Sequence, residues 1–130
     1  MLQHLNAAER SAVQRFVALL IERLGNNVVE DQLFGSAARG DMWSGRMPMR
    51  SDIDLLVLTR EPVVPTVQGD LDNETYPLFL ECGRQISLLF RTVAEFAAPV
   101  DDKGRSFVAR VQEEGRVLYR VPGLTQPGEG

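Results

Sequence analysis

Two aspartates in one apolar run constrain this chain more than any other feature. The segment Ile53 to Leu58 reads Ile-Asp-Leu-Leu-Val-Leu, and Asp52 precedes it directly. Such a dense apolar run is typical of a central strand buried on both faces. Side chains two apart in a strand share a face, so Asp52 and Asp54 are expected side by side. Neighbouring carboxylates that lose hydration need neutralising, and Mg²⁺ takes carboxylate oxygens together with water and phosphate. A solvated edge strand is the alternative for the acid pair taken alone.

A glycine-serine turn is expected just before this strand. The run Val28 to Phe34 predicts a strand, which leads directly into Gly35 and Ser36, with Arg39 close by. Glycine lets the backbone approach a ligand, and backbone N–H groups at a helix start bind phosphate oxygens. The Ser36 hydroxyl and the Arg39 guanidinium can add contacts. An ordinary turn is the alternative for Gly35 and Ser36 alone. The turn and the acid pair on consecutive strands together favour a nucleotide site.

The rest of the chain alternates helices and strands, which predicts an α/β (α+β) fold with a small mixed β-sheet flanked by helices. We expect one domain over residues 1–120 and a flexible tail over 121–130. The first expected helix is capped by Asn6 and Glu9 and ends at Gly25, and a second is expected from about Val67 to Cys82, with a start that Pro77 leaves open. The remaining expected elements are a strand from Gln85 to Phe90, a short helix capped by Thr92 with Glu95, a helix from Gly104 to Gly115, and an extended piece from Val117 to Tyr119.

The composition narrows the class of partner. The chain has 130 residues and a net charge of −4. An acidic balance argues against a nucleic-acid partner, which needs a basic face, but a small nucleotide that brings metal ions stays compatible. The single cysteine, Cys82, cannot form an internal disulfide and suits a reducing compartment. The sequence contains no apolar run of the ~20 residues that a membrane span needs, and it shows no signal peptide. We therefore expect a cytoplasmic protein with no membrane partner.

Two segments carry a resemblance to a known family. LFGSAARGD, followed after a gap by SDIDLLVL, closely resembles the DNA polymerase β-type nucleotidyltransferases, specifically the short prokaryotic minimal nucleotidyltransferases. The closing segment FVARVQEEGRVLYR is similar to the end of that family, so the resemblance extends from Ala7 to Tyr119. It implies the nucleotidyltransferase fold and a metal-assisted transfer of a nucleotidyl group, AMP in the first instance, from a nucleoside triphosphate to a hydroxyl.

The resemblance also assigns roles residue by residue. It implies that Gly35 and Ser36 bind the nucleotide phosphates, with Arg39 in a supporting role. It implies that Asp52 and Asp54 are catalytic and bind Mg²⁺. Two metal ions held in this way would stabilise the attacking and leaving oxygens of an in-line displacement.

The chain departs from the family pattern in two places. Fifteen residues separate Ser36 from Asp52, which is more than in other small members of the family. We interpret the loop 41–50, which contains Trp43, as either a mobile flap or a plain surface loop. Ser87 stands where the family has a third carboxylate, and a hydroxyl cannot serve as a base near neutral pH. The nearest acids in the sequence are Glu81 and Glu95.

Several functions remain open from the sequence. The resemblance implies an antitoxin-like enzyme that modifies a partner HEPN (higher-eukaryote and prokaryote nucleotide-binding) toxin protein. The alternative is a catalytically impaired nucleotide- or partner-binding module that neutralises a HEPN protein by occlusion, as Ser87 suggests. Transfer to an antibiotic hydroxyl is a weaker alternative, and assembly as a homo-oligomer is a further option.

Overall fold

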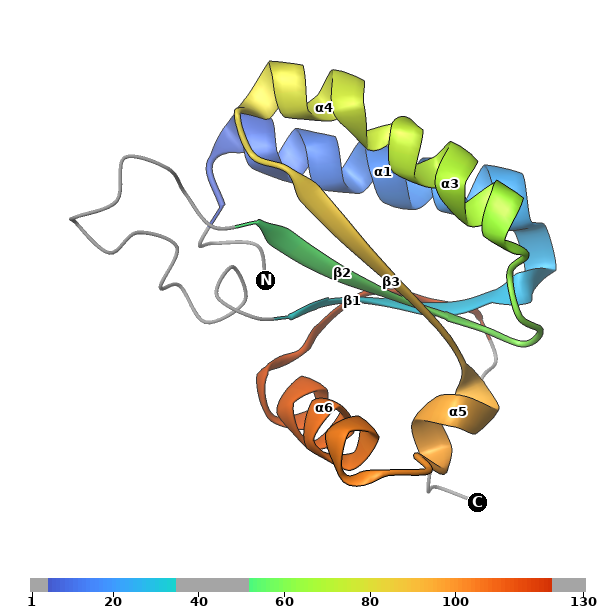
Figure 1. Cartoon of the computed structure of the whole chain (residues 1–130). Helices are drawn as coiled ribbons and strands as arrows, with labels where there is room; N and C mark the ends of the chain where they lie inside the picture. Colours follow the sequence, from blue (N-terminus) through green and yellow to red (C-terminus); the bar gives the residue numbers. More distant parts are fainter. Residues whose placement is uncertain (1–4, 35–51, 123–130) are drawn as a thin grey trace.

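A four-stranded sheet forms the centre of the computed structural model, which describes residues 5–34 and 52–122 (Figure 1). The strands lie in the order β3-β2-β1-β4. Strand β1 is antiparallel to β2 and β4, whereas β2 and β3 are parallel. The predicted mixed sheet is therefore confirmed. The strands are β1 (Val28–Phe34), β2 (Ile53–Thr59), β3 (Ile86–Thr92) and β4 (Arg116–Arg120).

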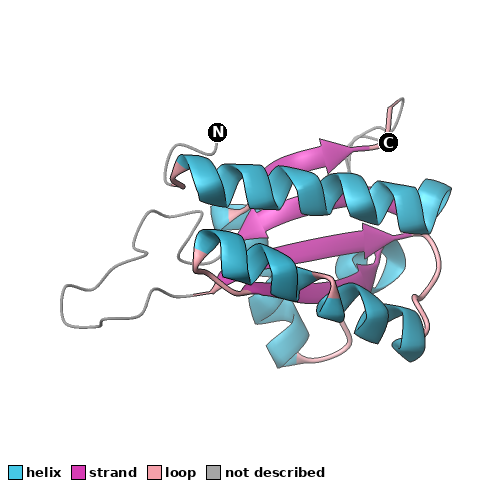
Figure 2. Cartoon of the chain, turned by 90° about the horizontal axis from the view of Figure 1, so that it is seen from above, coloured by secondary structure: helices cyan, strands magenta, loops and turns pink. Residues whose placement is uncertain are grey.

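Helices cover both faces of the sheet. Over one face lie α1 (Ala7–Leu24), α3 (Pro65–Asn73) and α4 (Thr75–Cys82), as Figure 2 shows from above. Beyond the other face lie α5 (Val93–Ala97) and α6 (Asp102–Glu114). A 3-10 turn, Gly25–Asn27, joins α1 to β1. This confirms the predicted α/β class and gives the sheet a hydrophobic core on each side.

Strand β2 divides its side chains between these two cores. Leu55 and Val57 pack in the core under α1, α3 and α4, whereas Leu56 and Leu58 pack in the core beside α5 and α6. All four are at most 3% exposed. The burial on both faces that the apolar run predicts is confirmed. Because side chains alternate along a strand, Asp54 shares the α5–α6 face with Leu56 and Leu58.

Helix α1 follows the sequence prediction at both ends. Asn6 and Glu9 form a capping box, in which each side chain accepts the other's backbone N–H. Gly25 caps the C-terminus with a φ of 57°, a conformation that favours glycine. Between the caps, Phe16 and Leu20 are fully buried in the core.

The single helix predicted from Val67 to Cys82 is instead two helices. Helix α3 ends at Asn73 and α4 begins at Thr75, with Glu74 between them. Pro77 lies in the first turn of α4, where its missing N–H is harmless. In one continuous helix the Pro77 ring would clash with the carbonyl of Asn73, four residues earlier, so the break has a local cause.

The C-terminal elements begin earlier than predicted. Helix α6 starts at Asp102 rather than Gly104, because the Asp101 side chain accepts the N–H of Gly104 at 2.7 Å and caps the helix. The extended piece around Val117 is an edge strand, β4, paired with β1. In the segment expected as a tail, the N–H of Val121 donates to the carbonyl of Val29 at 2.9 Å.

Some predicted features lie outside the described residues. These are Gly35, Ser36 and Arg39, the loop 41–50 with Trp43, and residues 123–130 of the expected tail. Within residues 5–34 and 52–122, no helix has the length and apolar character needed to cross a bilayer.

Candidate active site

The sheet register brings Asp54 to the end of β1. Phe34, the last residue of β1, is the cross-strand partner of Asp54. Gly35 follows Phe34 in the chain, so the chain leaves β1 beside Asp54. Phe34 is 2% exposed and Asp54 is half-buried. The predicted acid therefore lies next to the point where the predicted glycine-serine segment begins.

Asp52 lies just before β2 rather than within it. The strand begins at Ile53, and Asp52 is exposed. The expected loss of hydration thus applies to Asp54 and not to Asp52. The Asp52 backbone is nevertheless held in place, because Nη2 of Arg84 lies 3.4 Å from its carbonyl oxygen. The next N–H, of Ile53, donates to the carbonyl of Gln85 at 2.9 Å.

A buried ion pair lies behind this strand start. Arg84 is 1% exposed and Glu9 is fully buried, with 3.7 Å between Nη1 and Oε2. Glu9 belongs to the α1 capping box, so Arg84 links the start of α1, the segment after α4 and the backbone of Asp52. Sequence reasoning missed Arg84, because an arginine between a helix and a strand is usually exposed.

Strand β3 presents Ser87 beside Asp54. The parallel register pairs these two residues, and Ser87 is half-buried. The alignment of Ser87 with the family's third carboxylate stays a prediction from the sequence resemblance. Glu81 forms an exposed ion pair with Arg15, and Glu95 caps α5. Neither acid lies on β3, because Glu81 is in α4 and Glu95 is in α5.

The oxygen donors at this end of the sheet fit a hard divalent cation. Mg²⁺ is usually bound through one or two carboxylates, with water and substrate phosphate in its other positions. Asp52 and Asp54 supply two carboxylates of this kind at one strand end. In the part of the chain that the structure describes, no group of three or more His, Cys, Asp and Glu side chains lies together.

Two arginines and two phenylalanines lie on the same face as Asp54. The Phe34 and Phe107 rings meet edge to face, with centroids 5.5 Å apart. The Arg110 guanidinium lies 5.9 Å from the Phe34 centroid, and that of Arg91 lies 5.6 Å from the Phe107 centroid. Arg110 belongs to α6. Its contact with the cross-strand neighbour of Asp54 depends on how α6 packs under β1.

Comparisons with known proteins bear on the fold. No protein-family model matches the chain, and no curated protein matches it. Several solved structures do resemble it, at 15–18% sequence identity in the three cases described next.

The spectinomycin adenyltransferase AAD(9) from Enterococcus faecialis, solved with ATP and spectinomycin, has a TM-score of 0.62 at 18% identity, over 86% of this chain and 56% of that chain. A toxin–antitoxin complex with AMP-PNP has a TM-score of 0.55 at 16% identity, over 84% and 74%. The complex of a tri-AMPylated HEPN toxin with an MNT antitoxin from Shewanella oneidensis has a TM-score of 0.54 at 15% identity, over 85% and 71%. At these identities the likeness establishes a shared fold.

Proposed function

We propose, on the premise that this chain has the nucleotidyltransferase fold, that it transfers a nucleotidyl group from a nucleoside triphosphate to a hydroxyl in a metal-dependent reaction. The observation that carries the proposal is the register that sets Asp54 opposite Phe34, where the chain continues into Gly35 and Ser36. The structures with ATP and with AMP-PNP that share the fold support AMP as the group transferred.

The proposed division of roles follows the positions of these residues. Asp52 and Asp54 hold Mg²⁺, in a two-metal arrangement, and Gly35, Ser36 and Arg39 hold the phosphates. When bound, the metal ions neutralise charge on the phosphates. The acceptor oxygen bonds to the α-phosphorus, the bond from that phosphorus to the bridging oxygen breaks, and pyrophosphate leaves. Since the Ser87 hydroxyl beside Asp54 cannot take the acceptor proton near neutral pH, that proton passes to water and turnover is expected to be slow.

The proposed acceptor is a hydroxyl on a HEPN-type helical protein in the cytoplasm, with this chain as its antitoxin. The support is the Shewanella oneidensis complex, in which a tri-AMPylated HEPN toxin accompanies an MNT antitoxin. The structural likeness to that complex extends over 85% of the present chain.

Label transfer tests this function. The chain is incubated with ATP labelled at the α-phosphate, Mg²⁺ and a HEPN-type protein. Asp54→Asn is expected to reduce transfer by roughly a hundredfold or more, since it removes a metal-binding carboxylate. Asp70→Asn, on the exposed surface of α3, removes the same charge over the opposite face of the sheet (Figure 2) and is expected to leave transfer unchanged. Equal labelling by wild type and Asp54→Asn would refute the proposal.

The pairing of Ser87 with Asp54 favours a second candidate function, a non-catalytic module that neutralises a HEPN protein by occlusion. Such a module would bind ATP with Mg²⁺, or the partner alone, without forming pyrophosphate. Calorimetry with ATP and Mg²⁺, followed by a pyrophosphate assay in the presence of the partner, separates the two functions. Binding without turnover favours the module, and turnover excludes it.

A further inference from the structure

An open pocket of about 810 Å³ lies between the end of β3, α5 and α6. It opens on the same face of the sheet as Asp54. The pair Leu56–Leu89 lies two residues beyond the pair Asp54–Ser87, which corresponds to about 6.6 Å along the strands. Its lining includes the apolar Leu89, Phe96 and Phe107 and the cationic Arg91, Lys103 and Arg110.

The cations of this pocket are not neutralised by its acids. Arg91, Lys103 and Arg110 are exposed, and none forms an ion pair with a carboxylate in the segments described. The two acids that line the pocket serve as helix caps. Glu95 accepts the Thr92 N–H at 2.8 Å, and Asp101 caps α6. With three cations against two carboxylates, the lining of the pocket has a net charge of +1, on a chain whose net charge is −4.

Two of these cations are held in position. The Arg91 guanidinium lies over the Phe107 ring, and its Nη1 donates to the carbonyl of Phe90 at 2.7 Å. Arg110 lies over the Phe34 ring. A guanidinium over an aromatic face loses less freedom when it binds an anion, so the two arginines are partly preorganised.

The spacing of the cations suits an extended chain better than a single nucleotide. Lys103 and Arg110 are seven residues apart on α6, about 10 Å along the helix. A triphosphate anchored at Asp54 can reach the Arg110 end of this row, because Phe34 is adjacent to both residues. Such a triphosphate would leave Lys103 without an anionic group to contact. An extended peptide rises about 3.3 Å per residue, and its side chains two or four residues apart share a face, about 6.6 or 13 Å apart. Acids spaced in this way bracket the separation of the two cations and can meet both of these long side chains, while an apolar side chain on the same face contacts Phe96.

We propose that this pocket binds an acidic, partly apolar segment of the acceptor protein and so brings an acceptor hydroxyl toward Asp54. The inference rests on the proposed function, because it takes the acceptor to be a protein. The segment follows the groove between β3 and α6, with its carboxylates on Arg91, Lys103 and Arg110 and an apolar side chain against Leu89 and Phe96.

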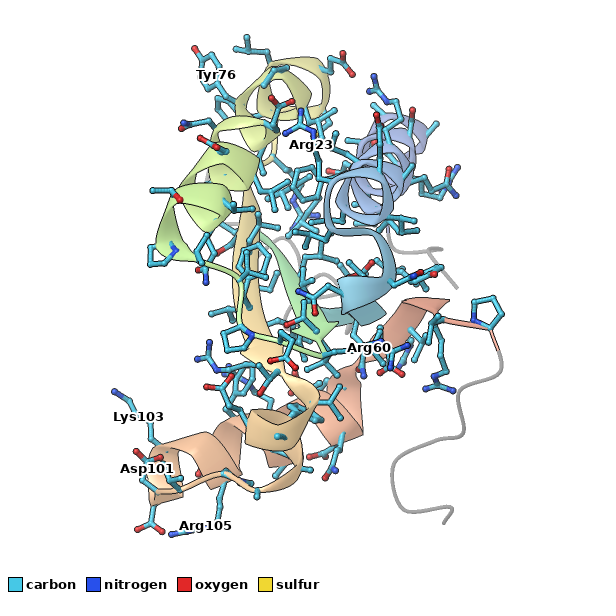
Figure 3. The ribbon with its side chains drawn as sticks, turned by 90° about the vertical axis from the view of Figure 1, so that its right-hand side faces the viewer. Arg23, Arg60, Tyr76, Asp101, Lys103 and Arg105 are labelled. Atoms are coloured by element: carbon cyan, nitrogen blue, oxygen red, sulfur yellow. The ribbon has the colours of Figure 1, made fainter. Side chains whose placement is uncertain are left out.

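Binding without nucleotide or metal tests this site separately from the reaction. The probe is a fluorescent copolymer of glutamate and tyrosine, and its affinity for the full chain is measured by anisotropy. The double variant Arg91→Gln, Arg110→Gln is expected to bind about tenfold more weakly. Arg105→Gln is the matched control. Arg105 is also on α6 but pairs with Asp102, and Figure 3 shows it leaving the helix in a different direction from Lys103. This control should bind within about twofold of wild type.

Three further measurements decide the outcome. Lys103→Gln, at an exposed position, is expected to weaken binding even if the double variant folds poorly by circular dichroism. A copolymer of lysine and tyrosine should not bind. Equal binding by wild type and the arginine variants, or equal binding of the two copolymers, would overturn the inference. Displacement of the glutamate copolymer by ATP would also overturn it and assign the pocket to the nucleotide. Loss of label transfer alone would count against the proposed function and not against this site.

Discussion

Asp31 occupies the middle of β1 with its carboxyl group fully buried. Neither side-chain oxygen has a hydrogen-bond partner among the described residues. Burial, together with the smaller effect of the charge on neighbouring Glu30, raises the pKa of Asp31 to about 7. The folded chain therefore binds a proton at Asp31 at a pH where the unfolded chain, with the usual pKa of 3.8, does not.

This buried carboxyl makes stability depend on pH. The pKa of Asp31 is higher in the folded chain than in the unfolded chain. The stability that proton binding at Asp31 contributes is therefore fully present below about pH 4 and is lost as pH rises through about 7. The loss over this window is on the order of 4 kcal/mol. Asp31→Asn should flatten the profile, as measured by urea unfolding at about pH 5 and about pH 8. Parallel pH profiles for variant and wild type would contradict the assignment to Asp31.

Ser87 offers the most direct residue-scale test of catalysis. A carboxylate at Ser87 would lie beside Asp54 in the parallel register and could bind metal or take a proton. Ser87→Asp is expected to raise label transfer roughly tenfold to a hundredfold. Ser87→Asn has a similar shape without the charge and should give no increase. An equal effect of the two variants would attribute the change to side-chain size.

Asp54 and Ser87 could be identified from the sequence, whereas Arg84 and Asp31 could not. The place of Asp54 follows from alternation within an apolar run, which is local, and Ser87 was singled out by the resemblance of its strand to a known family. Arg84 is buried because Glu9, 75 positions earlier in the chain, lies against it, and Asp31 is buried because β1 is covered by α1 and flanked by β2 and β4. Such partners are set by the tertiary structure, so the same residue types read as exposed in the sequence.

At the scale of elements, the junction between α6 and β4 is tightly packed. Gly115 caps α6, and a Cβ atom there would lie 2.5 Å from the carbonyl oxygen of Val111 and would also contact the Gln32 side chain. Because one of these neighbours is backbone, the clash cannot be relieved by a side-chain rotation alone. Gly115 therefore sets how closely the end of α6 approaches β1.

Two glycine substitutions are expected to act in opposite directions. Gly115→Ala should destabilise the fold by about 1–3 kcal/mol, because the helix end must move away from β1. Gly69→Ala, in the interior of α3, has no heavy atom within 4 Å of the added Cβ. It should stabilise the fold by roughly 0.5–1 kcal/mol through helix propensity. Urea midpoints measure both, and a destabilising Gly69→Ala or a neutral Gly115→Ala would contradict this packing.

The helix ends show which element boundaries sequence can locate. Both capping boxes, Asn6 with Glu9 and Thr92 with Glu95, were found from residues three apart. The break between α3 and α4 at Glu74 was missed, because the apolar pattern continues across it. The pairing of the last strand with β1, and hence the strand order, also lies beyond any local pattern.

At the scale of the whole molecule, nucleotide binding should appear as added stability. A ligand that binds only the folded chain at about a hundred times its Kd adds about 2.7 kcal/mol. For a chain of this length, ATP with Mg²⁺ should then raise Tm by roughly 10 °C. Removing Mg²⁺ with a chelator, or Asp54→Asn, should abolish the shift, whereas Asp70→Asn should retain it. An undiminished shift in chelator would contradict a metal at this site.

Strand β1 is an interior strand only because β4 pairs with it. The Glu30 carboxylate of β1 and the Arg120 guanidinium of β4 lie 2.6 Å apart across 90 positions of chain. A ribosome releases the first strand long before it makes the fourth. During translation, then, the nascent sheet has a bare edge next to the strand that leads to the candidate site. The pairing that makes β1 an interior strand can therefore form only after residue 120 has left the ribosome.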